Sequence, residues 1–414
     1  MATSVSLSRL AWRNLWRNMR RTLLTLSGIS FGVLLAVIMT GLTDATYGDM
    51  IDYAAKMGTG HVTIERDEFR GAPTFEHAVR IDEEFIREAQ QDKRVVHVVR
   101  RILGAALVAS SEGNQGATLM AIDPRREGEN TLLFLDEFGE GALFNTPDAQ
   151  TISIGSVLAS NLGVGLGKKV VVTVTNRTGE IVSAMFRVSG LISTGAPSID
   201  RGLIILPLET TQRLLSYDPA EVTAAAIYLK DHRDAKSVAR DLSAHVSSPA
   251  MALDWERSQP ELASFIAMKK SSGVIVQALV MLMLAAGIFN TLFVSVMERH
   301  HEFGVLRAIG FSPSELFRLI SWESFWLACV GLVASVLVTA APYAYLAEHG
   351  IDYSELIEPG MEVSGVAMNP IMSVGIYPVN ALIIATVVFF ATMTAGIFPA
   401  WRASRTEPVE AILS

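Results

Sequence analysis

The sequence has one cysteine, Cys329, and 15 prolines among its 414 residues. A single cysteine excludes a disulfide scaffold, and so few prolines exclude a collagen-like or proline-rich disordered chain. Charge is also scarce, because Asp, Glu, Lys and Arg make up 18% of the residues, against about 25% in ordinary soluble domains. The net charge of −8 offers no basic surface for nucleic acid. Hydrophobic residues, in contrast, make up 50% of the chain.

These hydrophobic residues gather in four runs without any charge, at residues 22–43, 271–297, 324–347 and 363–401. Each run is long enough to cross a hydrocarbon core of about 30 Å as a helix. The first run exceeds the apolar part of a cleaved signal peptide and has no small-residue cleavage site after it, so we expect a retained anchor. The sequence therefore predicts a membrane protein with four transmembrane α-helices, at residues 22–44, 271–297, 322–347 and 378–401.

The distribution of basic residues predicts the orientation of these helices. Five arginines and no acidic residue precede the first run, whereas the loop at residues 348–377 has five acidic residues and no Lys or Arg. Because basic residues concentrate on the cytoplasmic side, we expect both termini and the loop at residues 298–321 in the cytoplasm. Residues 1–21 then form a cytoplasmic amphipathic helix, residues 402–414 a cytoplasmic tail, and residues 348–377 a short acidic loop outside.

One large region, residues 45–270, lies outside the membrane between the first and second predicted helices. Its 24 basic and 30 acidic residues give a net charge of −6. Alternating or β-branched segments predict strands, and apolar periodicity predicts helices, so we expect an α+β domain with a small β-rich insert near residues 151–206. The predicted strands lie at 61–66, 95–110, 117–123, 169–176, 184–193, 201–207 and 222–230, and the helices at 82–91 and 232–246. Residues 260–282 contain no helix breaker except Gly273, so the second membrane helix could continue outward as a stalk.

Motifs that could carry chemistry are weak. Residues 28–32 read GISFG, which fits the elbow of a serine hydrolase but lies inside a membrane run. Gly28 and Gly32 are better explained as a small-residue face for helix packing. Asn290, an amide within the second run, is expected to bond between helices. No stretch matches the phosphate-binding loop of ATPases, and the histidines at 300 and 301 have no metal-site spacing. We therefore expect no catalytic residue, metal or cofactor in this chain.

The loop after the second run carries the most informative pattern, "VMERHHEFGVLRAIGFSPSELFRLI" at residues 296–320. It resembles the signature of the FtsX/MacB/LolC–LolE class of ABC transporter permeases. "LAWRNLWRNMRRTLLTLSGISFG" at residues 10–32 and "PAWRASRTEPVEAIL" at residues 399–413 are similar to the two ends of these proteins. The resemblance covers nearly the whole chain. Within this loop, Ser312, Pro313 and Glu315 also form a capping-box pattern, which predicts a helix start.

The resemblance implies a coupling helix at about residues 302–319 that docks into a separate ABC ATPase dimer, which binds the ATP and magnesium. The residues it assigns to this coupling are Glu298, Arg299, Glu302, Phe303, Gly304, Leu306, Arg307, Gly310, Phe311 and Glu315. It also implies a second permease subunit, identical or homologous, and a location in the bacterial inner membrane.

The implied function is mechanotransmission from the ATPase to the periplasm. Lipoprotein release is the first expectation. The alternatives are MacB-like efflux of a drug or peptide, and FtsX-like signalling to a cell-wall hydrolase. The periplasmic partner is correspondingly a carrier, an exit duct or a hydrolase.

Overall fold

The computed structural model describes residues 2–71, 73–135, 138–246, 248–354, 362–363, 366–367 and 371–405. It divides into two compact units. The helical unit comprises residues 1–46, 268–353 and 371–414, and the sheet unit comprises residues 47–267 and 354–370. The boundaries therefore fall inside two long helices, one after Thr46 and the other after Ala267.

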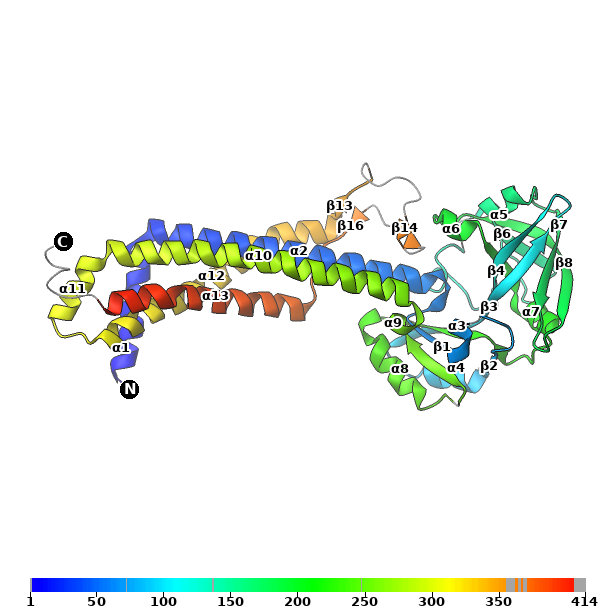
Figure 1. Cartoon of the computed structure of the whole chain (residues 1–414), viewed down its shortest axis with the longest axis horizontal. Coiled ribbons are helices and arrows are strands. Elements are labelled where there is room, and N and C mark those ends of the chain that lie inside the picture. The colour runs from blue at the N-terminus through cyan, green and yellow to red at the C-terminus, as the bar shows by residue number, and fades with distance from the viewer. Residues whose placement is uncertain are drawn as a thin grey trace. The chain divides into compact units, whose positions relative to one another are not determined.

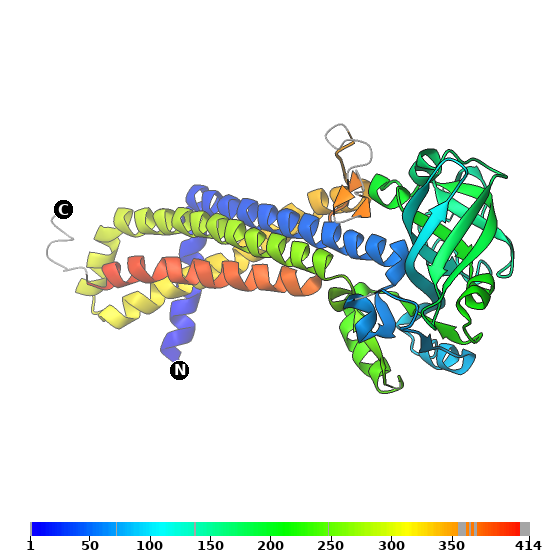
Figure 2. The same cartoon turned by 45° about the vertical axis from the view of Figure 1, so that its right-hand side comes forward.

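In the helical unit α2, α10, α12 and α13 are long apolar helices that run side by side, whereas the shorter α1 and α11 lie at one end of them (Figures 1 and 2). The helices are α1 (Ala2–Arg17), α2 (Met19–Ala54), α10 (Pro260–Glu298), α11 (His300–Ala308), α12 (Pro313–His349) and α13 (Pro378–Ser404). Among the described residues, α2, α10, α12 and α13 are long and apolar enough to cross a membrane. They share a core that includes Ile29, Ile288, Leu327 and Val388. The predicted four helices, one before and three after the large domain, are confirmed.

Two of these helices are longer than the charge-free runs. α2 continues to Ala54 and α10 begins at Pro260, so both helices extend into the sheet unit. The outer turns pack through Met50, Ile51, Leu262 and Ile266. The predicted continuation of the second membrane helix before its charge-free run is therefore confirmed.

The sheet unit contains one ten-stranded sheet in the order β12-β1-β11-β3-β4-β9-β6-β8-β5, while β7 pairs with both β3 and β8. These pairings close β3, β4, β9, β6, β8 and β7 into a ring of strands whose interior is filled by side chains such as Val172 and Phe186. The strands are β1 (Val62–Arg66), β3 (Val95–Ala109), β4 (Asn114–Ile122), β5 (Phe138–Gly141), β6 (Thr151–Gly155), β7 (Lys169–Thr175), β8 (Ile181–Ile192), β9 (Leu203–Pro207), β11 (Ala224–Leu229) and β12 (Ala250–Asp254).

Short helices cover parts of this sheet. α8 (Ala235–Ser243) packs on β1 and β12 through the buried residues Val238 and Leu242. The others are η1 (Ala55–Thr59), α3 (Asp67–Gly71), α4 (Glu83–Ala89), α5 (Ser156–Asn161), α6 (Pro197–Asp200), α7 (Leu208–Leu215), η2 (His232–Asp234) and α9 (Trp255–Ser258). Two-residue ladders join β2 (Val79–Arg80) to β10 (Glu221–Val222), β13 (Ile351–Asp352) to β16 (Ile371–Met372), and β14 (Glu362–Val363) to β15 (Val366–Ala367).

The α+β class of the large domain is confirmed. Residues 151–206, expected as a β-rich insert, supply β6, β7, β8 and β9 and also the helices α5 and α6. They join the rest of the sheet through the parallel pair β4–β9 and the antiparallel pair β3–β7. The segment therefore forms part of the central sheet and shares its core.

Candidate functional site

The loop between α10 and α12 forms a short helix between two breaks. α10 ends at Glu298, and Arg299 adopts a non-helical conformation before α11 begins. Gly310 has a φ of +111°, which favours glycine, and allows the chain to turn after α11. Ser312 then caps α12 by accepting the Glu315 amide proton (3.3 Å), while its own amide donates to the Glu315 carboxylate (2.8 Å). The predicted capping box is confirmed.

The prediction of a single coupling helix at residues 302–319 is wrong. α11 ends at Ala308, and the remaining residues form the turn and the first turns of α12. The positive φ at Gly310 and the capped start at Ser312 explain the division, because each interrupts a helix. The result is a helix–turn–helix.

Phe303, expected as a docking residue, is instead completely buried. Its side chain packs in a cluster with Val296, Leu316, Ile320 and Ala400. Phe303 therefore fixes α11 against α10, α12 and α13 and is not available to a partner. Gly304 is also buried, and Leu306 and Phe311 are half-buried in a cluster with residues of α1 and α12.

The charged residues of the loop are engaged inside the chain. Arg299 pairs with Glu302 (3.0 Å) and Glu323 (3.2 Å), and Glu302 also pairs with Arg17 of α1. Asn14 donates to Glu323 (2.7 Å). We call Asn14, Arg17, Arg299, Glu302 and Glu323 the polar staple, because together they attach α1 to α11 and α12. The hydrogen bond from the Arg17 guanidinium lowers the pKa of Glu302 most strongly. Desolvation opposes this shift, and Arg299 adds to it, so the pKa is lowered overall.

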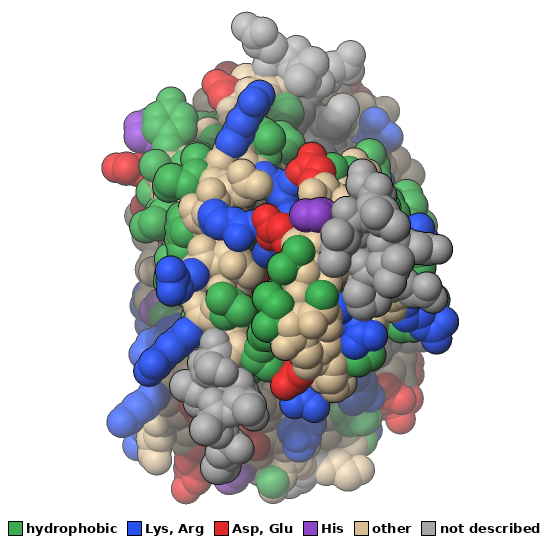
Figure 3. Space-filling model, turned by 90° about the vertical axis from the view of Figure 1, so that its left-hand side faces the viewer, with side chains coloured by type: hydrophobic (Ala, Val, Ile, Leu, Met, Phe, Trp, Pro, Cys, Tyr) green, Lys and Arg blue, Asp and Glu red, His purple; other side chains and the backbone are tan. Residues whose placement is uncertain are grey.

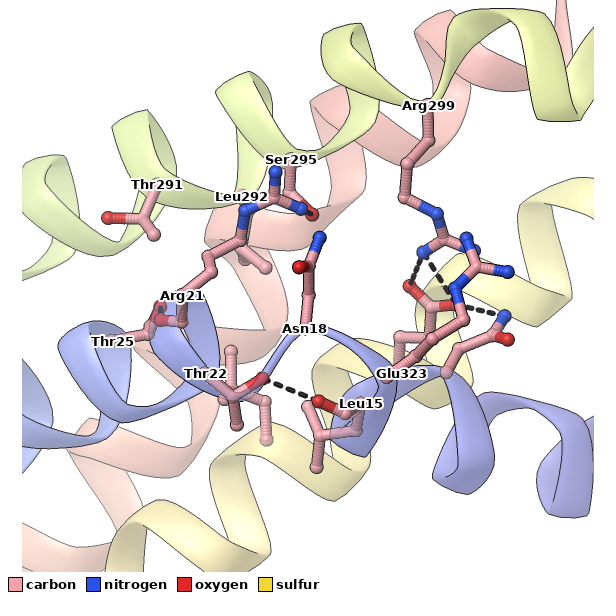
Figure 4. Close-up of a pocket in the computed structure, with 13 residues that line it drawn as sticks. Leu15, Asn18, Arg21, Thr22, Thr25, Thr291, Leu292, Ser295, Arg299 and Glu323 are labelled. Atoms are coloured by element: carbon pink, nitrogen blue, oxygen red, sulfur yellow. Dashed lines mark hydrogen bonds and ion pairs between the residues drawn. The ribbon is translucent and has the colours of Figure 1, made fainter.

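A second set of polar contacts lies beside the polar staple (Figure 4). Arg21 pairs with Glu298 and donates to Ser295 (2.6 Å), joining the first turn of α2 to the last turns of α10. A cavity of about 50 Å³ lies between α1, α2, α10 and α12, and Asn18, Arg21 and Ser295 line it. Glu298, Arg299 and Glu302 thus connect helices within the chain, which the sequence pattern did not reveal.

The exposed part of the loop is mainly apolar. Ile309 is 75% exposed and Val305 38% exposed, with Ala308, Gly310, Pro313 and Ser314 exposed beside them. We call these six residues the loop tip. Arg307 donates to the Phe311 carbonyl (3.1 Å) and is half-buried. Basic side chains are spread over the face seen in Figure 3. The exposed arginines of α1, of the first turns of α12 and of the last turn of α13 include Arg9, Arg13, Arg17, Arg318 and Arg402.

The residues expected to pack helices divide into two groups. A Cβ on Gly32 would lie 2.6 Å from the Leu284 side chain, so Gly32 allows α2 and α10 to approach closely. A Cβ on Gly28 would meet nothing within 4 Å. Asn290 lies exposed on α10, and no described residue forms a hydrogen bond with its amide. The prediction that Gly28 and Asn290 pack helices together therefore stays a prediction, because the partner helix would have to come from another subunit.

Sequence reasoning missed Asp44, which lies buried immediately after the first apolar run. Its carboxylate accepts from the Tyr377 amide (3.2 Å) and from Asn380 (2.7 Å), and so holds the start of α13 against α2. The only signal in the sequence is that Asp44 is the first charge after the run.

Comparison with known proteins establishes the family. The model of the MacB-like periplasmic core domain matches residues 22–245, just over half of the chain, and the model of the FtsX-like permease C-terminal domain matches residues 274–408. The chain belongs to the family of FtsX-like permeases with a MacB-like periplasmic core domain. The resemblance noted in the sequence is thus confirmed.

Individual relatives of this FtsX-like permease are distant. It is 27% identical to the lipoprotein-releasing system transmembrane protein LolC of Xylella fastidiosa, over 93% of this chain and 92% of the relative. It is 24% identical to the pyoverdine export ATP-binding/permease protein PvdT of Pseudomonas putida, over 98% of this chain and 59% of the relative. The periplasmic region of MacB from Actinobacillus actinomycetemcomitans matches 50% of this chain and 94% of that chain, with 15% identity and a TM-score of 0.34.

Proposed function

We propose that this chain is the permease subunit of an ABC transporter of the bacterial inner membrane, which uses ATP hydrolysis by a separate ATPase to release lipoproteins. The end-to-end similarity to LolC supports the lipoprotein substrate. The loop tip supports coupling to an ATPase, because it is an apolar projection on a helix that is held in place from behind. It is the observation on which the coupling part of the proposal rests.

The proposed mechanism begins at the loop tip. The ATPase binds ATP and magnesium and receives Val305, Ile309 and their neighbours in a groove. Phe303 and the polar staple fix α11 to α1, α10 and α12. Movement of the loop tip therefore passes to whole helices instead of being absorbed by a flexible loop. α2 and α10 continue without interruption into the sheet unit, so they can carry this movement outward.

A second permease subunit, identical or homologous, completes the transporter in this proposal. Exposed Gly28 and Asn290 support this, because a small residue and an unsatisfied amide on membrane helices both favour a further helix partner. Outside, a periplasmic carrier would receive the released lipoprotein.

Co-purification and a release assay test the function. The chain is expressed with the ATPase and second permease encoded nearest to it, and the complex is reconstituted in proteoliposomes with a lipidated substrate protein. We expect ATPase co-purification and ATP-dependent release of the lipoprotein. A complex that hydrolyses ATP but leaves the lipoprotein in the bilayer would contradict this substrate.

Export of a small molecule is the second candidate, because PvdT and the macrolide export protein MacB of Nitrobacter winogradskyi are each 24% identical to the chain. The same proteoliposomes distinguish the two functions. ATP-dependent movement of a macrolide or of pyoverdine without lipoprotein release would favour export.

The proposed orientation has its own test. With Cys329→Ala as background, Ser314→Cys in the loop tip should be protected from an impermeant thiol reagent in intact cells, and Ser354→Cys should react. Labelling of Ser314→Cys from outside would overturn the cytoplasmic location of the loop tip.

A further inference from the structure

The end of α2 contains a break that has the form of a hinge. After Ala54 the chain forms the π-helix η1, in which Gly58 has a φ of +141°, and Gly60 follows with a φ of +75°. Distortions of this kind often mark places where a helix bends. Whether the break bends or is rigid decides how movement of α2 reaches the sheet.

One buried guanidinium holds this break to the sheet. Arg101 of β3 is completely buried, and its Nη1 donates to the Gly58 carbonyl. Its Nε and Nη2 donate to Glu127 (2.8 and 2.7 Å), which is also buried, and Nη2 donates to the Thr131 carbonyl (3.2 Å). The ring of Tyr228 on β11 lies 5.7 Å from the guanidinium carbon. We call Arg101, Glu127 and the carbonyls of Gly58 and Thr131 the stalk anchor.

The charge of Arg101 is maintained despite its burial. Desolvation by itself lowers the pKa of Arg101, but the interactions with Glu127 and Tyr228 more than offset it, and the pKa is raised above its ordinary value. Burial raises the pKa of Tyr228 to about 12, so its hydroxyl stays protonated and donates to the Thr131 carbonyl. Arg101 and Tyr228 therefore both donate to the Thr131 carbonyl and hold its loop to the sheet.

Packing leaves the break no room to bend. Ala55 is buried against Val99, Ala226 and Tyr228 of the sheet. A Cβ on Gly58 would lie 2.7 Å from the end of the Met120 side chain. The Leu133 amide donates to the Lys56 carbonyl (3.2 Å), which ties η1 to the same loop.

A second attachment lies one turn earlier on α2. The Leu229 amide donates to Nδ1 of His61 (3.0 Å), so the ring proton sits on Nε2 and is donated to Asp52 (2.9 Å). His232 also contacts Asp52 (3.1 Å). The last turns of α2 accordingly belong to the sheet unit, whose boundary falls before Tyr47.

We infer that Arg101 is a positioning residue that turns the break at Ala55–Thr59 into a rigid joint, so that the outer turns of α2 and the sheet move as one body. This inference rests on the proposed function as a mechanically coupled permease. In this inference, α2 does not bend relative to the sheet at η1.

Distance measurement in the wild-type joint is the first test. With Cys329→Ala as background, spin labels are placed at Ser264 and Thr118, both exposed in the sheet unit. Ser264 lies between Leu262 and Ile266, which pack on the last turns of α2, so its label follows α2. We expect one narrow distance distribution, the same for the chain alone and for its complex with the ATPase trapped by ATP and vanadate. A broad distribution, or a shift of more than about 2 Å, would overturn the inference.

A paired substitution then separates coupling from stability. Removing one partner of a buried ion pair leaves an unpaired charge, whereas replacing both by apolar residues is often tolerated. Arg101→Met/Glu127→Leu should therefore fold and bind the ATPase while the distance distribution broadens. Transport per ATP hydrolysed should fall at least about fivefold, the lower end of typical coupling effects. Unchanged distances and transport in this variant would overturn the inference.

Two controls complete the design. Arg100→Met removes the neighbouring arginine of β3, which contacts Glu83 (3.1 Å) and the Pro219 carbonyl (3.2 Å), and should leave coupling unchanged. A Lys56→Cys/Leu133→Cys disulfide added to the paired variant, with its formation verified by mass, should restore coupling until it is reduced. If the wild type released no lipoprotein, this result would count against the proposed function and not against the rigid joint. The distance between the labels at Ser264 and Thr118, measured in the chain without the ATPase, would still test the joint.

Discussion

Replacing Ile309 by aspartate tests whether the loop tip binds the ATPase. Ile309 is 75% exposed, and complete burial of an isoleucine side chain contributes roughly 1.5–3 kcal/mol. Burying the exposed three quarters in a groove would then contribute roughly 1–2 kcal/mol, and its loss should raise the Kd for the ATPase roughly 5- to 30-fold. Aspartate adds the cost of desolvating a charge, so we expect the upper end of this range.

The assay is a titration of the immobilised permease with purified ATPase. Ile309→Leu keeps the apolar side chain and should bind within about twofold of the wild type. Ile371→Asp changes an exposed isoleucine outside the loop tip and should also bind normally. An unchanged Kd for Ile309→Asp, in a chain that inserts and folds normally, would refute the assignment of the loop tip as the docking surface.

Three further outcomes are expected. Gly32→Leu should reduce the yield of folded permease because its side chain would collide with Leu284, whereas Gly28→Leu should fold as a single chain and fail only in assembly with a second permease, as measured by crosslinking. Glu302→Arg should weaken ATPase binding through displacement of α1, and adding Arg17→Glu should restore it; no recovery would mean that Glu302 contacts the ATPase directly. Because the pKa of Glu302 is lowered, its ion pair with Arg17 should stabilise the position of α1 above the ordinary Glu pKa of about 4.3. This stabilisation should be lost as the pH falls from that value through the lowered pKa. Tryptophan fluorescence from α1 can follow the loss.

The membrane helices could be predicted from the sequence because the absence of charge over about 20 residues is a local property. That rule stops at the first charge, so it ended the first helix at Asp44, although α2 continues to Ala54 in a part of the chain that no longer needs to be apolar. Most strands of the sheet unit were also predicted from local patterns. Of the central sheet, β5, β6 and β12 were missed. β5 has four residues of which two are glycine, and β12 contains no β-branched residue, so neither has the composition that predicts a strand.

The roles of individual residues were harder to predict than the elements. Phe303 and Ile309 lie six positions apart in one amphipathic stretch, yet one is completely buried and the other largely exposed. Glu302 has the charge of a surface residue, but its partner Arg17 lies 285 positions earlier in the chain. Neither fact follows from spacing, since both depend on how α1 and α13 pack against the loop.

The polar staple and the stalk anchor solve the same physical problem in the two units. α11 is joined to α10 and α12 by two breaks, and η1 is itself the break that follows α2. Each would bend if nothing held it. In both units arginine–glutamate ion pairs hold the break, and a buried side chain, Phe303 or Ala55, fills the space behind it. Directional, charge-assisted hydrogen bonds fix the angle of a joint, which apolar packing alone does poorly. Arg17 and Glu302 are partly exposed, whereas the side chains of Arg101 and Glu127 are buried. In the proposed transmission of movement, the charges at both joints are better explained by the geometry they impose than by a contribution to stability.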